Sequence, residues 1–170
     1  MTLKPKVQEA VNEQIRAEFE SAYLYLAMSA RFEALNLRGF AHWMRVQWQE
    51  ETQHALKFFD FLIRRGGTPE LKALAKPEVT FETAREAFEQ VLEHERYITG
   101  RIHELYELAR KEHDYALQTL LHWFIDEQVE EEEVAQEILD SLQLVEGDGP
   151  GLFMLDRELG ARKAGEEEDA

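Results

Sequence analysis

The sequence contains no cysteine among its 170 residues. This absence excludes a disulfide framework, a zinc site with thiolate ligands and any cysteine-ligated iron–sulfur or rubredoxin-type centre. No apolar run approaches the roughly 20 residues that a helix needs to cross a membrane, and the first residues lack the apolar segment of a signal peptide. We therefore expect a cytoplasmic protein that does not bind membranes.

Positive charge is also scarce, because 19 Lys and Arg residues stand against 35 Asp and Glu residues. The resulting formal net charge of −16 at pH 7 repels phosphate backbones and attracts metal cations. Nucleic acid is therefore not an expected partner. A chain of this length, 44% hydrophobic and 32% charged, suits one helix-rich domain. We place that domain at residues 1–160, followed by an acidic, disordered tail at residues 161–170.

Hydrophobic periodicity predicts four long helices and one short helix. The long helices cover about residues 5–35, 40–66, 83–110 and 115–144, and the short helix covers residues 152–159. A brief connection at residues 36–39 predicts that the first two helices form an antiparallel hairpin. After Gly67, about 15 residues with two prolines form a long crossover, which leaves helices two and three parallel. The predicted fold class is all-α, a four-helix bundle with a long crossover between helices two and three and a short fifth C-terminal helix.

Each long helix has one face, or seam, with apolar residues at its two ends and polar residues in its middle. Counted from the two hairpin turns, the polar seam positions lie at heights that agree within about two helical turns. The sequence thus predicts one polar layer across the centre of the bundle. Its members are Glu18, Glu51, His54, Glu95, Gln128 and Glu131.

This polar layer contains four carboxylates, one imidazole and one amide, but no lysine or arginine. A lone glutamate on a helix is usually exposed, yet six polar residues on inward faces at one height favour burial together. Buried carboxylates are costly unless something balances their charge. Two divalent cations would neutralise four glutamates, and an oxygen-rich ligand set with one histidine suits iron or manganese. The layer is therefore predicted to be a dinuclear carboxylate metal site.

Three further glutamates, Glu50, Glu127 and Glu130, each precede a polar seam residue by one position. They are candidates to bind a further, accessory ion, although an acidic run such as residues 130–133 is more usually a solvated face. Tyr25 also lies in the layer, where it is a candidate to donate a hydrogen bond to Glu95 or an electron during oxygen reduction. Trp123 is a candidate to assist it.

The chain closely resembles the ferritin family, and within it the non-haem bacterial ferritins. Ferritin-like di-iron proteins place one Glu on each of two helices and Glu-x-x-His on each of two others. Three of these elements match, at Glu18, Glu95 and Glu51-Thr-Gln-His54. The fourth helix departs from the pattern with Gln128-Val-Glu-Glu131, which implies a weaker, transient second metal position. Thr52 stands where bacterioferritins have a haem-ligating methionine, so no haem is expected.

The resemblance implies a ferroxidase that oxidises Fe²⁺ to Fe³⁺ with dioxygen or peroxide and stores ferric mineral in a homo-oligomeric shell, a 24-mer. It implies two irons per subunit, the first held by Glu18, Glu51 and His54. The second would be held by Glu51, Glu95 and Glu131, with Gln128 beside it and Glu51 as the bridge. A third iron at the accessory glutamates is also implied. Two alternatives stay open: a di-iron or di-manganese redox enzyme without mineral storage, and an acidic helical scaffold whose glutamates are protonated or hydrated.

Overall fold

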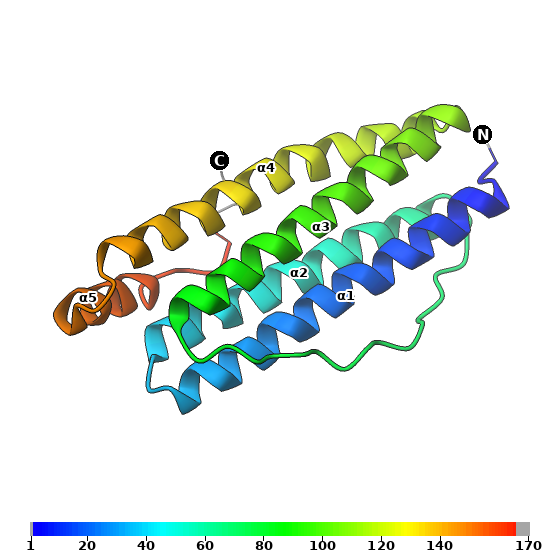
Figure 1. Ribbon diagram of the computed structural model, residues 1–170. Coiled ribbons are helices and arrows are strands. Elements are labelled where there is room, and N and C mark those ends of the chain that lie inside the picture. The colour runs from blue at the N-terminus through cyan, green and yellow to red at the C-terminus, as the bar shows by residue number, and fades with distance from the viewer. Residues whose placement is uncertain (1, 166–170) are drawn as a thin grey trace.

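The computed structural model describes residues 2–165, and that part of the chain contains five α-helices and no strand (Figure 1). The helices are α1 (Pro5–Ala34), α2 (Arg38–Arg64), α3 (Ala84–Lys111), α4 (Tyr115–Leu144) and α5 (Gly149–Leu159). The predicted all-α class, with four long helices and a short fifth one, is confirmed. Within residues 2–165, no helix is both long enough and apolar enough to cross a membrane.

The four long helices form two hairpins, α1 with α2 and α3 with α4 (Figure 1). Residues 65–83 connect the hairpins and run back along the bundle beside α1, which confirms the predicted crossover (Figure 1). This segment is fastened to α1 by polar contacts. The Asn12 side chain donates to the Thr68 carbonyl at 3.1 Å and accepts from the Glu70 amide at 2.8 Å. The Lys72 ammonium lies 2.6 Å from a Glu13 oxygen.

Specific local signals set the helix boundaries. After α1 and α3 the chain turns through left-handed residues, Asn36 with φ 60° and His113 with φ 57°, and such residues end helices. Helix α3 begins with a capping contact, because the Thr83 hydroxyl accepts a hydrogen bond from the Glu86 amide at 3.2 Å. The Asp114 carboxylate caps α4 in the same way, by accepting from the Leu117 amide at 3.0 Å.

Helix α5 begins at Gly149, three residues before the predicted start at residue 152. The glycine-rich stretch at residues 147–151 suggested a break throughout, but Pro150 lies in the first turn of the helix, where a missing N–H costs nothing. The helix packs on the start of α2, where the Phe40 amide donates to the Asp156 carboxylate at 3.0 Å. A Cβ at Gly39 would lie 1.6 Å from the Asp156 carbonyl oxygen, so this close contact requires glycine.

The core is divided into two apolar clusters, one toward each end of the bundle. One surrounds Phe32, Phe40 and Phe88 near the α1–α2 turn, and the other surrounds Phe58 and Phe124 toward the opposite end. All six residues of the predicted polar layer are buried, and they lie between the two clusters. Residues 161–165 of the predicted tail are described and contact α2 through Arg162, whereas residues 166–170 lie outside the described part. The predicted domain limits therefore stay a prediction.

Candidate metal centre

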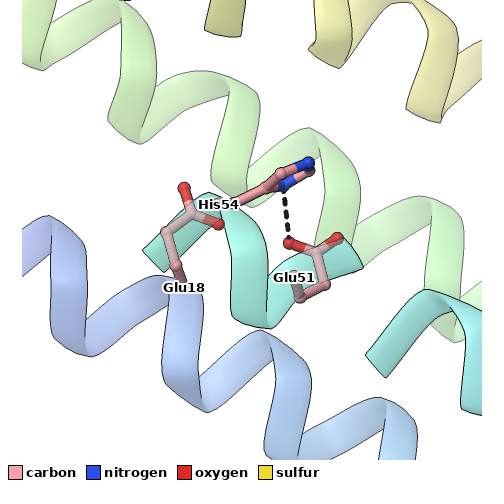
Figure 2. A group of neighbouring side chains, drawn as sticks. All are labelled: Glu18, Glu51 and His54. Carbon is pink, nitrogen blue, oxygen red and sulfur yellow. Dashed lines mark hydrogen bonds and ion pairs between the residues drawn. The ribbon is translucent and has the colours of Figure 1, made fainter. Parts of the chain in front are cut away.

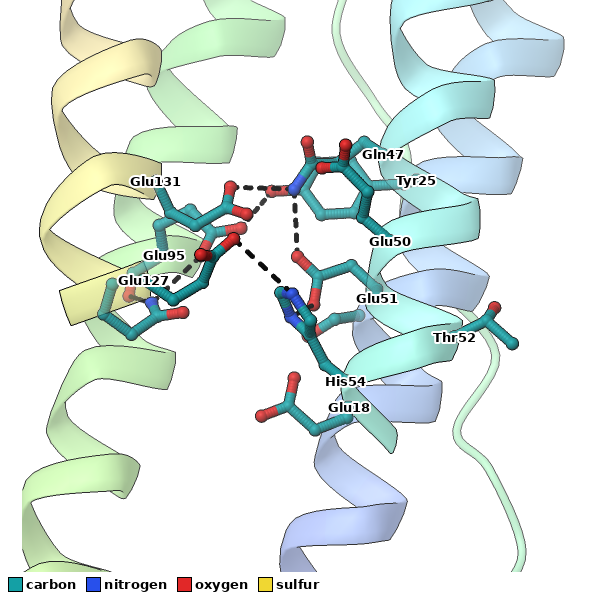
Figure 3. Close-up of polar contacts among 12 residues, drawn as sticks. Glu18, Tyr25, Gln47, Glu50, Glu51, Thr52, His54, Glu95, Glu127 and Glu131 are labelled. Atoms are coloured by element: carbon teal, nitrogen blue, oxygen red, sulfur yellow. Dashed lines mark hydrogen bonds and ion pairs between the residues drawn. The ribbon is translucent and has the colours of Figure 1, made fainter. Parts of the chain in front are cut away.

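The polar layer predicted from the sequence lies between the two apolar clusters, and its labelled side chains point toward one another from the surrounding helices (Figure 3). Its six side chains come from all four long helices, and none is more than 6% exposed. They are Glu18 from α1, Glu51 and His54 from α2, Glu95 from α3, and Gln128 and Glu131 from α4. The antiparallel hairpins bring them to one height because each lies a similar number of residues from its own turn.

Ligand atoms in the layer form three groups of three residues, and the atoms of each group lie within 4.8 Å of one another. The groups are Glu18 with Glu51 and His54 (Figure 2), Glu51 with Glu95 and Glu131, and His54 with Glu127 and Glu131. The first two coincide with the two iron ligand sets that the ferritin resemblance implied. Glu51 belongs to both of them, which is the arrangement that a bridging carboxylate requires.

Hydrogen bonds hold these carboxylates in place. The amide nitrogen of Gln47 donates to Glu51 at 3.0 Å and to Glu131 at 2.8 Å (Figure 3). Two residues donate to opposite oxygens of Glu95, namely the Tyr25 hydroxyl and the Gln128 amide nitrogen, the latter at 3.1 Å. The predicted hydrogen bond from Tyr25 is thus present, while its role as an electron donor stays a prediction.

Burial controls the protonation of the layer when no metal is bound. Burial, reinforced by the charge of Glu51, raises the pKa of both Glu18 and Glu95 from 4.5 to about 8. Burial would also raise the pKa of Glu51, but the charge of His54 and hydrogen bonds from His54 and Gln47 outweigh it and lower that pKa. For His54, burial is outweighed by Glu51 and Glu127, so its pKa is raised well above 6.5. The metal-free layer therefore holds protons in the places that cations would take.

The surroundings of one carboxylate oxygen indicate whether a metal ion fits in the layer. Glu18 Oε2 is buried, and among residues 2–165 it has no hydrogen-bond partner. A buried acceptor left in this state is costly, and this one belongs to the group that also contains Glu51 and His54. A cation between these three side chains would satisfy it. The surrounding donors are mostly oxygen with one imidazole, which suits iron or manganese.

The three predicted accessory glutamates lie in different surroundings. Glu127 is buried and its carboxylate lies 3.6 Å from His54 Nε2, so it joins the layer. Glu50 is half-buried and forms an ion pair with Arg162 at 2.8 Å. Glu130 is exposed, and none of the three ligand groups found in the described residues includes it or Glu50. Only Glu127 is thus brought together with the dinuclear ligands.

A pocket of about 490 Å³ connects the layer to the surface between α2 and α4. Its lining includes the buried side chains of His54 and Glu127, the side chains of Lys57 and Trp123, and residues 164–165. The Trp123 ring is 36% exposed and meets the His54 ring edge-on, with 5.4 Å between the ring centroids. This contact places Trp123 beside the layer, and its assisting role stays a prediction.

Sequence reasoning missed several residues that support the layer. Gln47 was on the predicted seam of α2 but was not counted among the site residues, although its amide contacts two ligands. Gln14, which donates to Glu18 at 2.9 Å, lies one position off the α1 seam. For Gln47, its place one turn before Glu51 on the same seam was a usable signal. Arg162 had none, because its contacts depend on how the chain returns after α5.

Comparisons with known proteins agree with this geometry. Residues 8–145 match the ferritin-like domain family. The bacterial non-heme ferritin of Bacteroides fragilis is 43% identical over 160 residues, which cover 94% of this chain and 99% of the relative. The Staphylococcus aureus protein of the same name is 35% identical over 165 residues, covering 97% and 99%. The open pore ferritin of Archaeoglobus fulgidus superposes with a TM-score of 0.93 at 48% identity, covering 95% of this chain and all of that one. The chain therefore belongs to the ferritin family.

Proposed function

We propose that this protein stores iron as a ferritin, by oxidising Fe²⁺ to Fe³⁺ in the polar layer and retaining ferric mineral inside a homo-oligomeric shell. The observation that carries the proposal is the buried layer itself, in which four carboxylates and one histidine form ligand groups that share Glu51. Family membership and relatives named bacterial non-heme ferritins support iron as the metal. A net charge of −16 favours the approach of Fe²⁺.

Two Fe²⁺ ions per chain are the substrates of this chemistry. Glu18, Glu51 and His54 would hold one ion, and Glu51, Glu95 and Glu131 the other. Together the two ions give two electrons, which with two protons convert dioxygen to hydrogen peroxide or peroxide to water. Anionic carboxylates favour the higher charge of Fe³⁺ over Fe²⁺, so they assist the loss of these electrons. Gln128 donates to Glu95 and fixes the orientation of this ligand.

Iron binding must also displace protons from the layer. Glu18 and Glu95 have a pKa of about 8, and that of His54 is raised, so all three hold protons near neutral pH without metal. Incoming Fe²⁺ takes the place of these protons. The pocket beside Trp123 and Glu127 offers them, and the iron, a route between the layer and solvent.

Finer parts of the proposal concern a third iron and haem. Glu127 would be the main ligand of an accessory iron, with Glu50 and Glu130 able to reach it only if their side chains move. The protein is proposed to bind no haem, since Thr52 has no sulfur and donates its hydroxyl to the Trp48 carbonyl at 2.8 Å. Its side chain points away from the polar layer (Figure 3). The shell is proposed to be a 24-mer. Exposed apolar side chains such as Leu144, Phe153 and Met154 would contact neighbouring copies in it.

An aerobic Fe²⁺ titration of the metal-free protein tests this function by counting the iron that each chain retains after unbound metal is removed. Retention far beyond the roughly two ions of one dinuclear layer is expected. Saturation near two would overturn mineral storage and support a redox enzyme, and no retention would leave a helical scaffold. Glu51→Ala should slow the oxidation at least about 100-fold because both ligand sets lose a member. Glu133→Ala, an exposed glutamate on α4, is the matched control and should oxidise iron at the wild-type rate.

A further inference from the structure

An arginine outside the polar layer reaches two of its carboxylates through one buried glutamine. Arg162 Nη1 donates to Gln47 Oε1 at 3.1 Å. The amide nitrogen of the same Gln47 donates to Glu51 and Glu131 at 3.0 and 2.8 Å (Figure 3). Glu51 and Glu131 both belong to the second ligand set, and Glu51 also belongs to the first. The position of one side-chain amide thus bears on both proposed iron positions.

The chemistry of the neighbours permits only one orientation of the Gln47 amide. A guanidinium has five N–H donors and no acceptor, so the group facing Arg162 must be the amide oxygen. Ionised carboxylates accept hydrogen bonds but cannot donate them, so the group facing Glu51 and Glu131 must be the NH₂. Without the arginine, Gln47 Oε1 would lose its donor, and only the two carboxylates would hold the amide in place. Arg162 therefore reinforces the orientation that supports the ligands and restricts the movement of the Gln47 side chain.

Arg162 is itself firmly held on α2. Its Nη2 atom donates to Glu50 Oε2 at 2.8 Å, and its Nη1 atom also approaches the Trp43 carbonyl at 3.3 Å. The guanidinium lies over the Trp43 ring, 4.5 Å from the centroid. The Arg162 side chain is 12% exposed, so these contacts are largely shielded from solvent. A fork-shaped cation with this many fixed partners is well suited to hold another side chain still.

A second chain of contacts repeats the arrangement on the other side of the layer. Arg101 Nε, from α3, donates to Gln14 Oε1 at 3.2 Å, and Gln14 Nε2 donates to Glu18 Oε1 at 2.9 Å. Arg101 has no acceptor, so it requires the Gln14 amide oxygen to face it, which leaves the NH₂ to face Glu18. Of the two proposed iron ligand sets, Glu18 belongs only to the one that also contains Glu51 and His54. This chain of contacts therefore bears on the first iron position only.

We propose that Arg162 and Arg101 are positioning residues of the metal layer, which act through Gln47 and Gln14 to hold Glu51, Glu131 and Glu18 in their ligating orientations. The inference rests on the proposed function, because it assumes that the layer binds metal. Residues that orient metal ligands in this way commonly change metal affinity by 10–100-fold when they are removed.

A double-mutant cycle tests the relay, meaning the chain of hydrogen bonds from Arg162 through Gln47 to Glu51 and Glu131. It uses a metal that has no redox chemistry. Zn²⁺ is titrated by calorimetry into the metal-free forms of the wild type, Arg162→Ala, Gln47→Ala and the double variant. Each single variant should weaken zinc binding about 10-fold or more. The double variant should be no weaker than Gln47→Ala alone, because Arg162 has nothing to orient once the amide is gone. Lys163→Ala, at an exposed neighbouring position, is the matched control and should bind as the wild type does.

Each outcome of the cycle decides a different point. The relay would be overturned if Arg162→Ala reduced zinc affinity equally in the wild type and in Gln47→Ala. It would also be overturned if Arg162→Ala caused no loss of zinc affinity. Lower melting temperatures with unchanged zinc affinity of the folded chains would also overturn it, since that result describes a merely structural arginine. Failure of the wild type itself to bind about two zinc ions would refute the proposed metal site instead.

The contacts from Arg101 through Gln14 to Glu18 allow a test that distinguishes the two metal positions. Arg101→Ala should weaken the zinc position that contains Glu18 and leave the other close to its wild-type affinity, whereas Arg162→Ala should weaken both. Arg162→Lys should recover only part of the lost affinity, because one ammonium cannot replace a planar fork that serves Gln47 and Glu50 together. Equal loss at both positions in Arg101→Ala, or full recovery in Arg162→Lys, would contradict the proposed geometry.

Discussion

Asp114 and Glu95 are both buried carboxylates, but they lie in regions of the bundle with opposite electrostatic surroundings. At the α3–α4 turn, burial alone would raise the pKa of Asp114, but two hydrogen bonds from Arg65, at 2.8 and 3.1 Å, help to lower it. In the middle, the Glu95 carboxylate accepts hydrogen bonds from neutral groups of Tyr25 and Gln128, and burial raises its pKa to about 8. The protein supplies the cation for the first carboxylate. The second is proposed to bind a metal ion from solution.

The apolar clusters and the polar layer have opposite effects on the stability of the metal-free protein. The clusters at the two ends bury aromatic rings, which stabilises the fold without any bound partner. The layer between them collects carboxylates whose raised pKa values are a cost to the metal-free fold. We therefore expect substitutions at the ends and in the middle to change stability in opposite directions.

The largest effect is expected for Phe40→Ala in the apolar cluster near the α1–α2 turn. Phe40 is fully buried, with its ring stacked on Phe32 at 5.2 Å and edge-on to Phe88 at 6.0 Å. Its removal should lower the free energy of unfolding by about 3–5 kcal/mol, measured by chemical denaturation of the metal-free protein. Zinc affinity of the folded chains should not change. Phe40→Leu, which fills most of the space, should lose clearly less, and an equal loss would argue against cavity formation as the cause.

Glu95→Gln should have the opposite effect on the metal-free protein. Because the folded pKa of Glu95 lies above its ordinary value of 4.5, the group destabilises the fold increasingly as pH rises from about 4.5 to about 8. Glutamine keeps the shape without this cost, so at pH 8 the variant should unfold about 1–3 kcal/mol less easily than the wild type. Near pH 4.5 the two should be equal. If Glu95→Gln were less stable than the wild type at pH 8, the Glu95 carboxylate would not destabilise the metal-free fold.

The pH dependence of metal binding follows from the same protons. Zinc must displace those held by Glu18, Glu95 and His54, whose pKa values are all raised. Lowering the pH from 7.5 to 6.5 should weaken binding about tenfold for each proton displaced, equivalent to about 1.4 kcal/mol per proton. Calorimetry in two buffers with different ionisation enthalpies measures the protons released. Release of no protons near pH 7 would mean that the metal-free layer is already ionised.

Most of the fold and the layer could be predicted from the sequence because both depend on local periodicity. Helical spacing selects the buried face, and equal distance from a hairpin turn sets the common height of residues such as Glu18 and Glu51. Periodicity put Gln47 on the buried face of its helix but could not show which ligands its amide would contact, and Gln14 lies off the predicted seam of α1. It also could not locate Arg162, whose contact with Gln47 joins residues 115 positions apart. Pro150 misled the prediction of α5, because a local breaker is also a permitted first residue.

The smallest effect is expected for Asp114→Asn, which sharpens the comparison with Glu95. Asparagine Oδ1 can still accept from the Leu117 amide and from Arg65 Nη1, as Asp114 Oδ1 does. The substitution therefore removes mainly the charge and the second hydrogen bond from Arg65, and the loss in unfolding free energy at pH 7 should be about 1 kcal/mol. Since the folded pKa of Asp114 is lowered from 3.8, its contribution is present above that value and disappears as pH falls through the folded pKa. Denaturation at pH 7 and in acid measures both. The variant should thus be less stable at neutral pH and equal to the wild type in acid, whereas Glu95→Gln gains stability as the pH rises. If both substitutions changed stability in the same direction at pH 8, the paired and the unpaired carboxylates would not differ in the way that their surroundings imply.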